Sequence, residues 1–385
     1  MASSLPRICY VLSHFFPNAS GAEQQALAQG AELVRRGHSV RVVTHFIKGL
    51  PVDDQLEGVR IHRWIKTSSR GPLFGISFVL GVIRALTKLR PDYDLVHTHQ
   101  GLWEAISTGV ARPLLRGAPT LIQPASSGYY GEAEELARTR GFPLLRRAIL
   151  RNTRFVAISA DIERQWLALG VPPSKMVRLA SGVDARQFHP GPAGDRVEST
   201  LLPRPRVVFT GRLHPQKNLP TLLEAWPAVV AATGAALILV GDGEDRAALR
   251  DQASRLGVID HVQFVGRVED TSEFLRGADL FVLPSVAEGM SNSLLEAMAT
   301  ALPCLASAIG GNTDLLGTGD AGILLPADRP EAWSEAIIRV LTDGDLARSL
   351  GQAARRRVDA DFSIEAVVDR YQVLYRAMLG LEPAS

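Results

Sequence analysis

Short runs of β-branched residues alternate with helical patterns along the whole chain, and this alternation constrains the fold more than any other feature. In the first half, these runs predict strands at Ile8–Ser13, Val40–Thr44, Val59–His62, Leu95–Thr98, Thr120–Gln123, Phe155–Ile158 and Met176–Leu179. Between the first two runs, Leu27, Ala31 and Val34 recur at helical spacing, which predicts a helix. Strands that alternate with helices form βαβ units. The chain is therefore predicted to be an α/β protein with mostly parallel sheets.

The alternation stops once and then restarts, which predicts two domains. Residues 189–206 begin His-Pro-Gly-Pro-Ala-Gly and end Leu-Pro-Arg-Pro-Arg, a composition typical of a linker. Further strands are predicted after it, at Val207–Thr210, Ala236–Val240, Val262–Val265, Leu280–Leu283, Cys304–Ser307 and Ile323–Leu325. We therefore expect an N-terminal domain over residues 1–188, a linker over 189–205, a C-terminal domain over 206–362 and a last helix within 363–385.

Composition narrows the class of protein. Hydrophobic residues make up 46% of the chain and charged residues 21%, which excludes a disordered or fibrous protein. Cys9 and Cys304 are too few for a disulfide framework or a cysteine zinc site. The longest apolar stretch, Leu73–Ile83, is shorter than the roughly 20 residues of a membrane-spanning helix, and Ile8–Leu12 is too short for a signal-peptide core. We therefore expect a soluble, cytoplasmic protein.

Charge is distributed unevenly along the chain, although the net charge is only +2. Residues 1–190 contain 24 Lys and Arg against 14 Asp and Glu, so this half is basic and the rest is acidic. Part of the excess lies in one stretch with apolar residues in between, at Arg138, Arg140, Arg146, Arg147, Arg151 and Arg154. Two interpretations stay open: contact with an anionic membrane surface or acidic acceptor, and an ordinary solvated helix face.

One strand–loop–helix stretch carries the strongest functional signal. The buried strand Leu280–Leu283 is followed by a loop with Gly289 and by a helix that begins near Asn292, a good helix N-terminal residue. The N-terminal end of such a helix suits a phosphate group. Glu288 in the loop and Glu296 in the helix add carboxylates, which accept hydrogen bonds from sugar hydroxyls. An isolated pair of glutamates more often lies on an ordinary solvated surface than in a binding site. The surrounding sequence therefore decides between these two interpretations.

Cations that match a phosphate lie in a second stretch. A predicted strand ends at Thr210 and a helix begins near Asn218, so Arg212 and Lys217 lie in a loop at the carboxyl edge of the same sheet. Arginine offers a bidentate fork and lysine a point charge, a suitable pair for neutralising a leaving diphosphate. Ligands of doubly wound sheets bind at this edge, and two such domains are expected to enclose a cleft between their carboxyl edges.

Together these stretches resemble the donor-site motifs of retaining GT-B glycosyltransferases of glycosyltransferase family four. The spacing of Gly211-Arg212-Leu213 with Lys217-Asn218, and of Glu288-Gly289 with Glu296, matches those motifs. Other similar stretches extend the resemblance over nearly the whole chain, at 13–23, 36–40, 94–99, 181–184 and 240–244. The resemblance implies two Rossmann-like, doubly wound domains that face each other across a cleft, with a last helix that crosses back to the first domain.

The resemblance also implies a role for each matching residue. Arg212 and Lys217 would stabilise the leaving diphosphate, and Glu288 would hold hydroxyls of the donor sugar. His99, just past a strand end and facing the cleft, would approach the donor sugar and the acceptor. The remaining implied donor-binding positions are Gly21, Arg267, Val268, Gly289, Met290, Ser291, Asn292 and Glu296, with Glu296 at the nucleotide ribose and Gly21 close to the diphosphate.

The implied reaction moves a sugar from a UDP- or GDP-sugar to a carbohydrate, lipid-linked or small-molecule acceptor. It would proceed with retention at the anomeric carbon, without a metal or other cofactor, and would serve bacterial polysaccharide biosynthesis on the cytoplasmic side of the membrane. Nucleic acid is not an expected partner. The acceptor site is implied to include the loops 100–103 and 124–130.

Two alternatives on the same fold stay open. One is a nucleotide-sugar 2-epimerase, which needs no acceptor. The other is a non-catalytic nucleotide-sugar-binding subunit. The Arg212 and Lys217 motif, combined with Glu288 and Glu296, argues against both.

Overall fold

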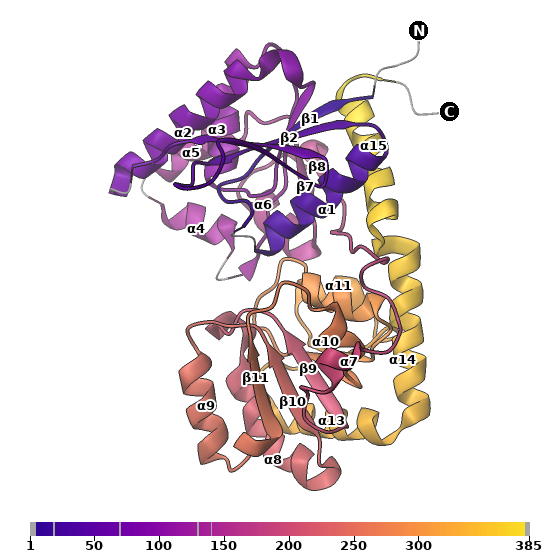
Figure 1. Ribbon diagram of the computed structural model, residues 1–385. Helices are drawn as coiled ribbons and strands as arrows, with labels where there is room; N and C mark the ends of the chain where they lie inside the picture. Colours follow the sequence, from indigo (N-terminus) through magenta and orange to yellow (C-terminus); the bar gives the residue numbers. More distant parts are fainter. Residues whose placement is uncertain (1–4, 18–19, 69–70, 129–130, 140, 382–385) are drawn as a thin grey trace. The chain divides into compact units, whose positions relative to one another are not determined.

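Each half of the chain builds its own sheet, and every predicted strand is present (Figure 1). The computed structural model describes residues 5–17, 20–68, 71–128, 131–139 and 141–381. Contacts divide the chain into two units, one formed by Met1–Gly182 with Ile364–Ser385 and the other by Val183–Ser363. The prediction of two α/β domains with mostly parallel sheets is therefore confirmed.

The first unit contains an eight-stranded sheet with the order β3-β4-β2-β1-β5-β6-β7-β8. Its strands are β1 (Arg7–Val11), β2 (Ser39–His45), β3 (Asp53–Leu56), β4 (Val59–Ile65), β5 (Leu95–Thr98), β6 (Thr120–Ile122), β7 (Arg154–Ala157) and β8 (Met176–Arg178). Its helices are α1 (Gly21–Arg35), α2 (Gly71–Lys88), α3 (Trp103–Ala111), α4 (Glu132–Arg138), α5 (Phe142–Ile149), α6 (Ala160–Ala168) and α15 (Ile364–Met378).

The second unit contains a six-stranded parallel sheet with the order β11-β10-β9-β12-β13-β14. Its strands are β9 (Arg206–Thr210), β10 (Ala236–Val240), β11 (Val262–Gly266), β12 (Leu280–Leu283), β13 (Cys304–Ser307) and β14 (Ile323–Leu325). Its helices are α7 (Asp195–Glu198), α8 (Leu219–Thr233), α9 (Arg246–Arg255), α10 (Ser272–Arg276), α11 (Asn292–Ala299), α12 (Gly310–Leu316), α13 (Pro330–Thr342) and α14 (Gly344–Arg357). Within the described residues of both units, no helix is long and apolar enough to cross a membrane.

The side chains of β1 point alternately to the two faces of the first sheet, and helices cover both faces. Cys9 and Val11 belong to a core cluster with Phe78 of α2, so they point to one face. Tyr10 points to the other face, where its ring lies against Gly30 of α1. Successive side chains of a strand point to opposite faces, and here helices cover both faces. This explains why the central strand reads as an unbroken apolar run.

The strand β3 is a feature that the sequence pattern missed. It pairs antiparallel with β4 at the edge of the sheet, and all other neighbouring strands are parallel. Asp53 and Asp54 are exposed and polar, so the segment lacks the β-branched composition used to find strands. Asp54 pairs with the buried Arg63 of β4 at 2.9 Å, which fixes the hairpin. The contact that stabilises β3 therefore comes from its neighbour.

The segment expected to be a linker, residues 189–205, belongs to the second unit. It contains the short helix α7, and its backbone donates hydrogen bonds to side chains of that unit. Gly194 N donates to Glu273 Oε2 at 2.5 Å, and Leu202 N donates to Gln263 Oε1 at 3.0 Å. Proline and glycine correctly indicate that this segment is mostly irregular. An irregular segment can still pack against a domain, as this one does.

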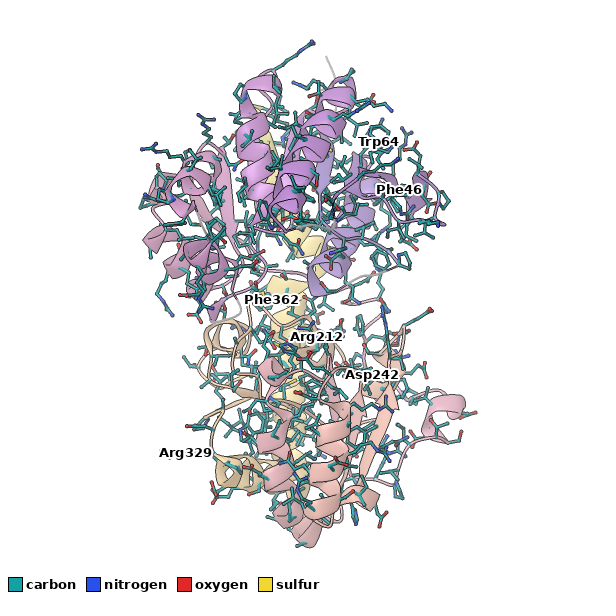
Figure 2. All side chains as sticks on the ribbon, turned by 90° about the vertical axis from the view of Figure 1, so that its left-hand side faces the viewer. Phe46, Trp64, Arg212, Asp242, Arg329 and Phe362 are labelled. Carbon is teal, nitrogen blue, oxygen red and sulfur yellow. The ribbon has the colours of Figure 1, made fainter. Side chains whose placement is uncertain are left out.

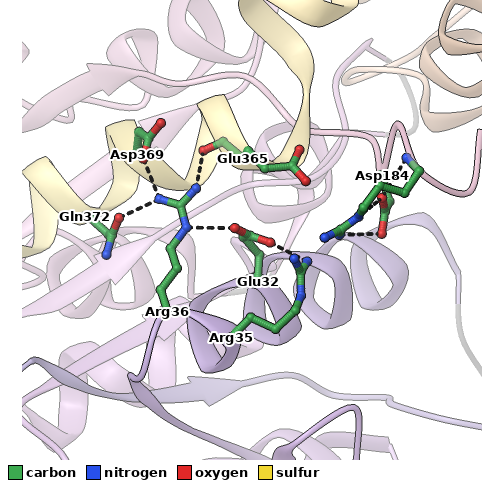
Figure 3. Close-up of polar contacts among 8 residues, drawn as sticks. Glu32, Arg35, Arg36, Asp184, Glu365, Asp369 and Gln372 are labelled. Atoms are coloured by element: carbon green, nitrogen blue, oxygen red, sulfur yellow. Dashed lines mark hydrogen bonds and ion pairs between the residues drawn. The ribbon is translucent and has the colours of Figure 1, made fainter.

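The last helix, α15, packs against α1 through a polar network around Arg36 (Figure 3). The Arg36 guanidinium donates to Glu32 Oε1 at 2.7 Å, to Gln372 Oε1 at 2.7 Å and to the Glu365 carbonyl at 2.9 Å, and it also pairs with Asp369. Glu32 is buried, so its charge depends on this pairing and on Arg35. Arg36 thus joins the helix that follows β1 to the C-terminal helix.

We predict that Arg36→Ala loosens α15. The substitution removes hydrogen bonds to three α15 residues and weakens the compensation of the buried Glu32 carboxylate, a cost of about 1–3 kcal/mol. Hydrogen exchange of the α15 amides should become faster. The control is Arg348→Ala, which breaks an exposed pair with Asp345 and should leave exchange nearly unchanged. Unchanged α15 protection in Arg36→Ala would show that the network is not what holds the helix.

Candidate functional site

The motif loops of the second unit meet at the point where the order of the strands reverses. From β9 the order runs to β10 and β11 on one side, and β12 lies next to β9 on the other. The connections that leave β9 and β12 therefore go to opposite sides, and such a switch point leaves a crevice at the carboxyl ends of the strands. Residues 211–218 follow β9 and residues 284–291 follow β12, so both motifs lie at the switch point.

Hydrogen bonds and an ion pair hold these two loops together. Gln216 Nε2 donates to the Ala287 carbonyl at 2.7 Å, and Val286 N donates to the Gln216 carbonyl at 2.9 Å. Lys217 Nζ lies 2.5 Å from Glu288 Oε1, and the two side chains are only 17% and 8% exposed. The pair is largely shielded from water, so each charge depends on the other. The structure thus brings together two of the predicted site residues.

Arg212 lies in the same loop, with an exposed side chain (Figure 2). Its guanidinium makes no hydrogen bond or ion pair with the residues that the structure describes. Gly211, directly before it, has a φ of +151°, which favours glycine. The loop therefore presents a cation with five N–H donors available to an anion.

Gly241 allows the neighbouring loop to approach closely. Its φ is +137°, and a Cβ at this position would lie 1.9 Å from the Gly211 carbonyl oxygen. Gly211 N donates to the Val240 carbonyl and Gly241 N donates to the Gly266 carbonyl, each at 2.9 Å. The chain segments that follow β9, β10 and β11 are therefore bonded to one another, which fixes the backbone under Arg212.

Helix α11 begins directly after the loop that carries Glu288. Ser291 is its N-cap, and the Ser291 Oγ accepts a hydrogen bond from Leu294 N at 3.3 Å. The prediction that the helix begins near Asn292 is confirmed. The positive end of the helix dipole therefore lies beside the ion pair and favours an anion there.

Glu296 lies one turn inside α11 and is half-buried. Burial raises the pKa of its carboxyl to about 7, and Asp270 adds to the increase, while a hydrogen bond from the Thr271 hydroxyl at 3.1 Å opposes it. A carboxyl with this pKa changes its charge within the physiological range. Glu296 is therefore a pH-sensitive acceptor at the site.

The other predicted donor residues of the second unit lie along the same edge. Arg267 and Val268 directly follow β11, where Arg267 is exposed and Val268 is half-buried. Gly289 and Met290 are buried in the loop before α11. A Cβ on Gly311 of α12 would lie 2.4 Å from the Gly289 carbonyl, so α12 lies close behind this loop.

His99 lies at the switch point of the first unit, directly after β5 and beside the end of β1. Its ring packs against Tyr10 and His97, with centroids 4.5 and 4.2 Å away. The sequence predicts a histidine that faces a cleft, but the side chain is only 1% exposed. Neither ring nitrogen has a hydrogen-bond partner among the described residues. Burial lowers the pKa of His99 to about 3, so the ring is neutral at physiological pH.

His97 and Gly21, two other residues of the similar stretches in the first unit, behave differently from His99. His97 is buried and bonded through both ring nitrogens, to the Tyr375 hydroxyl at 2.8 Å and to Gln123 Oε1 at 3.1 Å. It is a packed structural histidine, and it lies on the same face of β5 as His99, because side chains two residues apart along a strand point the same way. Gly21, which the resemblance places close to the diphosphate, is the first residue of α1, because Ser20 is the N-cap and forms a capping box with Glu23.

Sequence reasoning missed two buried carboxylates of the first unit. Glu104 of α3 accepts a hydrogen bond from Ser13 N at 2.9 Å. Glu132 of α4 accepts from Gly101 N and Ala125 N, each at 2.8 Å, and burial raises its pKa to about 7. An acidic residue within an apolar helical run was the available signal for Glu104. Nothing in the sequence pairs Glu132 with Gly101.

Glu132 joins the two loops that are implied to contact the acceptor, 100–103 and 124–130. Tyr129 and Tyr130 of the second loop lie outside the described residues. Within the residues that are described, no group of three or more His, Cys, Asp or Glu side chains is arranged to hold a metal ion.

Two protein-family models match the chain. The model described as Glycosyltransferase Family 4 matches residues 19–187, and the model described as Glycosyl transferases group 1 matches residues 204–343. The first match lies in the first unit except for residues 183–187, and the second match lies in the second unit. Together they cover most of the chain.

Two enzymes illustrate the similarity in sequence. The UDP-Gal:alpha-D-GlcNAc-diphosphoundecaprenol alpha-1,3-galactosyltransferase of Escherichia coli is 31% identical over 304 residues, which span 75% of this chain and 77% of that enzyme. The GDP-mannose-dependent alpha-(1-6)-phosphatidylinositol monomannoside mannosyltransferase of Mycobacterium tuberculosis is 28% identical over 378 residues, or 91% of this chain and 94% of that enzyme.

Solved structures support the same fold. Sucrose-phosphate synthase from Thermosynechococcus elongatus aligns with a TM-score of 0.81 at 24% identity and covers 97% of this chain and 99% of its own. The Anabaena protein HepE in complex with UDP and glucose aligns with a TM-score of 0.78 at 17% identity and covers 96% of this chain and 99% of its own. The chain therefore belongs to the group 1 glycosyl transferases of glycosyltransferase family 4, and it is a glycosyltransferase with the GT-B fold.

Proposed function

We propose that the protein transfers a sugar from a nucleoside-diphosphate sugar, with retention at the anomeric carbon, and that the second unit binds the donor. The observation that carries the proposal is the assembly of Arg212, the Lys217–Glu288 pair and the N-terminus of α11 at one switch point. A diphosphate needs cations and N–H donors, and a sugar ring needs a fixed hydroxyl acceptor. This edge supplies all three groups.

The chemistry follows from how charge develops during the reaction. When the glycosidic bond breaks, the bonding electrons go to the diphosphate oxygen, and negative charge accumulates there. Arg212 and Lys217 stabilise that charge together with the positive end of α11, and no metal ion is required in this proposal. Glu288 holds donor-sugar hydroxyls, and its ion pair with Lys217 orients both side chains before the donor binds.

His99 contributes as a neutral group. Because its ring is neutral, it can donate a hydrogen bond from one nitrogen and accept one at the other. Both nitrogens are without partners among the described residues, which supports a role toward a sugar hydroxyl. The proton released by the acceptor is proposed to pass to the leaving phosphate, so no protein side chain serves as nucleophile.

The acceptor is proposed to be carried on a lipid or to be a small molecule. The E. coli relative acts on a diphosphoundecaprenol-linked sugar, and the M. tuberculosis relative acts on a phosphatidylinositol mannoside. These names support bacterial surface-glycan assembly as the setting. The same relatives use UDP-galactose and GDP-mannose, which keeps both UDP- and GDP-sugars as candidate donors.

Donor cleavage across UDP-, GDP- and ADP-sugars, with and without EDTA, tests the proposal. We expect one donor to release its nucleotide equally well in EDTA, and the freed sugar to retain the donor's anomeric configuration when analysed at once by NMR. A new epimeric sugar formed without acceptor would instead identify an epimerase. Binding without cleavage, even with candidate lipid acceptors, would identify a binding subunit.

We predict that Lys217→Ala and Glu288→Gln each lower donor cleavage by at least about 100-fold. Each substitution removes one partner of a shielded pair and leaves the other misoriented. Arg329→Ala is the control, because Arg329 is exposed on the same unit and lies away from Arg212 (Figure 2). Circular dichroism checks the fold of all three variants. Wild-type cleavage by either site variant would remove that residue from the mechanism.

We predict that donor binding strengthens as the pH rises from about 6 to 8. The folded-state pKa of Glu296 is raised to about 7, so its carboxyl gains charge across this window, and the ionised form is the better acceptor for ribose hydroxyls. The donor KM for cleavage should therefore fall with pH in the wild type. In Glu296→Gln the KM should be higher and should not change with pH. A parallel pH dependence in both proteins would contradict the assignment.

We predict that Glu132→Gln loosens the two proposed acceptor loops. The amide has one acceptor oxygen, so it cannot accept from both Gly101 N and Ala125 N as the carboxylate does. Hydrogen exchange at these two amides should become faster, while the donor KM changes less than about twofold. Glu134→Gln, an exposed position on the same helix, is the control. Unchanged exchange at both amides would show that Glu132 does not position the loops.

A further inference from the structure

The last helix of the chain, α15, buries two tyrosines that lie four positions apart. Tyr371 and Tyr375 are 1% and 0% exposed, and residues at this spacing lie on one face of a helix. The helix belongs to the first unit, although the chain reaches it only after the second unit (Figure 1). Burial raises the pKa of both tyrosines well above its usual value, so both hydroxyls keep their hydrogen at neutral pH. α15 therefore carries two hydrogen-bond donors into the interior of the first unit.

These two hydroxyls fix the ring of His97 in β5. The Tyr371 hydroxyl donates to Gln123 Oε1 at 2.7 Å, and the same oxygen lies 3.1 Å from His97 Nε2. An amide oxygen only accepts hydrogen bonds, so Nε2 carries the hydrogen of the ring. Burial lowers the pKa of His97 well below its usual value, so the ring is neutral and its Nδ1 is an acceptor. The Tyr375 hydroxyl, 2.8 Å away, therefore donates to Nδ1.

The ring of His97 in turn lies directly against the ring of His99. The two ring centroids are 4.2 Å apart, and the ring planes are tilted by 31°. Tyr10 of β1 contacts both rings, with centroids 5.3 Å from His97 and 4.5 Å from His99. The ring nitrogens of His99 make no hydrogen bond with the described residues, so packing against these rings holds the side chain. A movement of the His97 ring is therefore expected to shift His99.

We infer that Tyr375 is a positioning residue for the transfer reaction. Its hydroxyl and Gln123 hold the His97 ring by both nitrogens, and this ring holds His99 where its nitrogens can meet the sugar. The inference rests on the role of His99 in the proposed function, and it adds a residue from the C-terminal helix to that role. The opposing interpretation is that the network only packs α15 onto the sheet. In that case, loss of the hydroxyl would not act through His99.

The variant Tyr375→Phe tests the inference, because it removes the hydroxyl and keeps the ring. The His97 ring then loses one of its two anchors, and His99 loses its fixed support. We expect kcat for donor cleavage to fall at least about 10-fold, while the donor KM changes less than about twofold. The matched control is Tyr93→Phe, because the Tyr93 hydroxyl is also buried in the first unit but donates to the Leu86 carbonyl at 3.1 Å. This control should keep the wild-type kcat.

A double-mutant cycle with His99→Ala separates positioning from general packing. If Tyr375 acts through His99, Tyr375→Phe should lower kcat no further once residue 99 is alanine. An equal loss in both backgrounds would overturn the inference. So would wild-type kcat in Tyr375→Phe when His99→Ala is slow. Wild-type kcat in His99→Ala would instead remove His99 from the proposed function, and the inference with it.

NMR of the full chain with isotope-labelled histidines tests the same geometry without a donor. In the wild type, His97 should be the tautomer with its hydrogen on Nε2, and a hydrogen on Nδ1 would overturn the network on which the inference rests. Tyr375→Phe should shift the ring signals of His99, whereas Tyr93→Phe should leave them in place. Circular dichroism verifies the fold of both variants. Unchanged His99 signals in folded Tyr375→Phe would overturn the inference.

Discussion

The reversal of strand order between β9 and β12 is the constraint on which the rest of the site depends. Because the connections diverge there, the segments 211–218 and 284–291 leave the sheet next to each other, although they are far apart in sequence. The loop that follows β10 lies very close to the Gly211 carbonyl. This approach is possible because Gly241, in that loop, has no Cβ. The first sheet has the same reversal between β1 and β5, and His99 follows β5 there.

At this switch point, the charges of Lys217 and Glu288 depend on each other, and Arg212 adds a second cation. The buried Glu288 carboxylate is stable because Lys217 lies against it, and Lys217 is held in turn by Glu288. Arg212 remains available to an anion, and α11 adds the positive end of its dipole. In the proposed reaction, an arriving diphosphate would therefore meet a lysine that Glu288 already orients, and this lysine would need little reorganisation during bond cleavage.

The fold could be predicted from the sequence because parallel strands are buried on both faces and read as apolar runs, as in β10 and β12. The edge strand β3 could not be predicted, because its exposed aspartates do not form an apolar run. Its stability comes from Arg63 of the neighbouring strand. The site motifs of the second unit could be found because each one is a single continuous stretch of sequence, although the second runs from a loop into α11. Contacts such as Glu132 with Gly101, and the burial of His99, join segments distant in sequence and depend on tertiary packing.

Hydrogen exchange with and without the nucleoside diphosphate of the cleaved donor is the most direct test of the central claim. If the switch point of the second sheet binds the donor, amides of residues 211–218 and 285–296 should exchange more slowly when the nucleotide is bound. The same protection should be lost in Arg212→Ala at equal nucleotide concentration. Protection confined to other segments, with these two unchanged, would contradict the account.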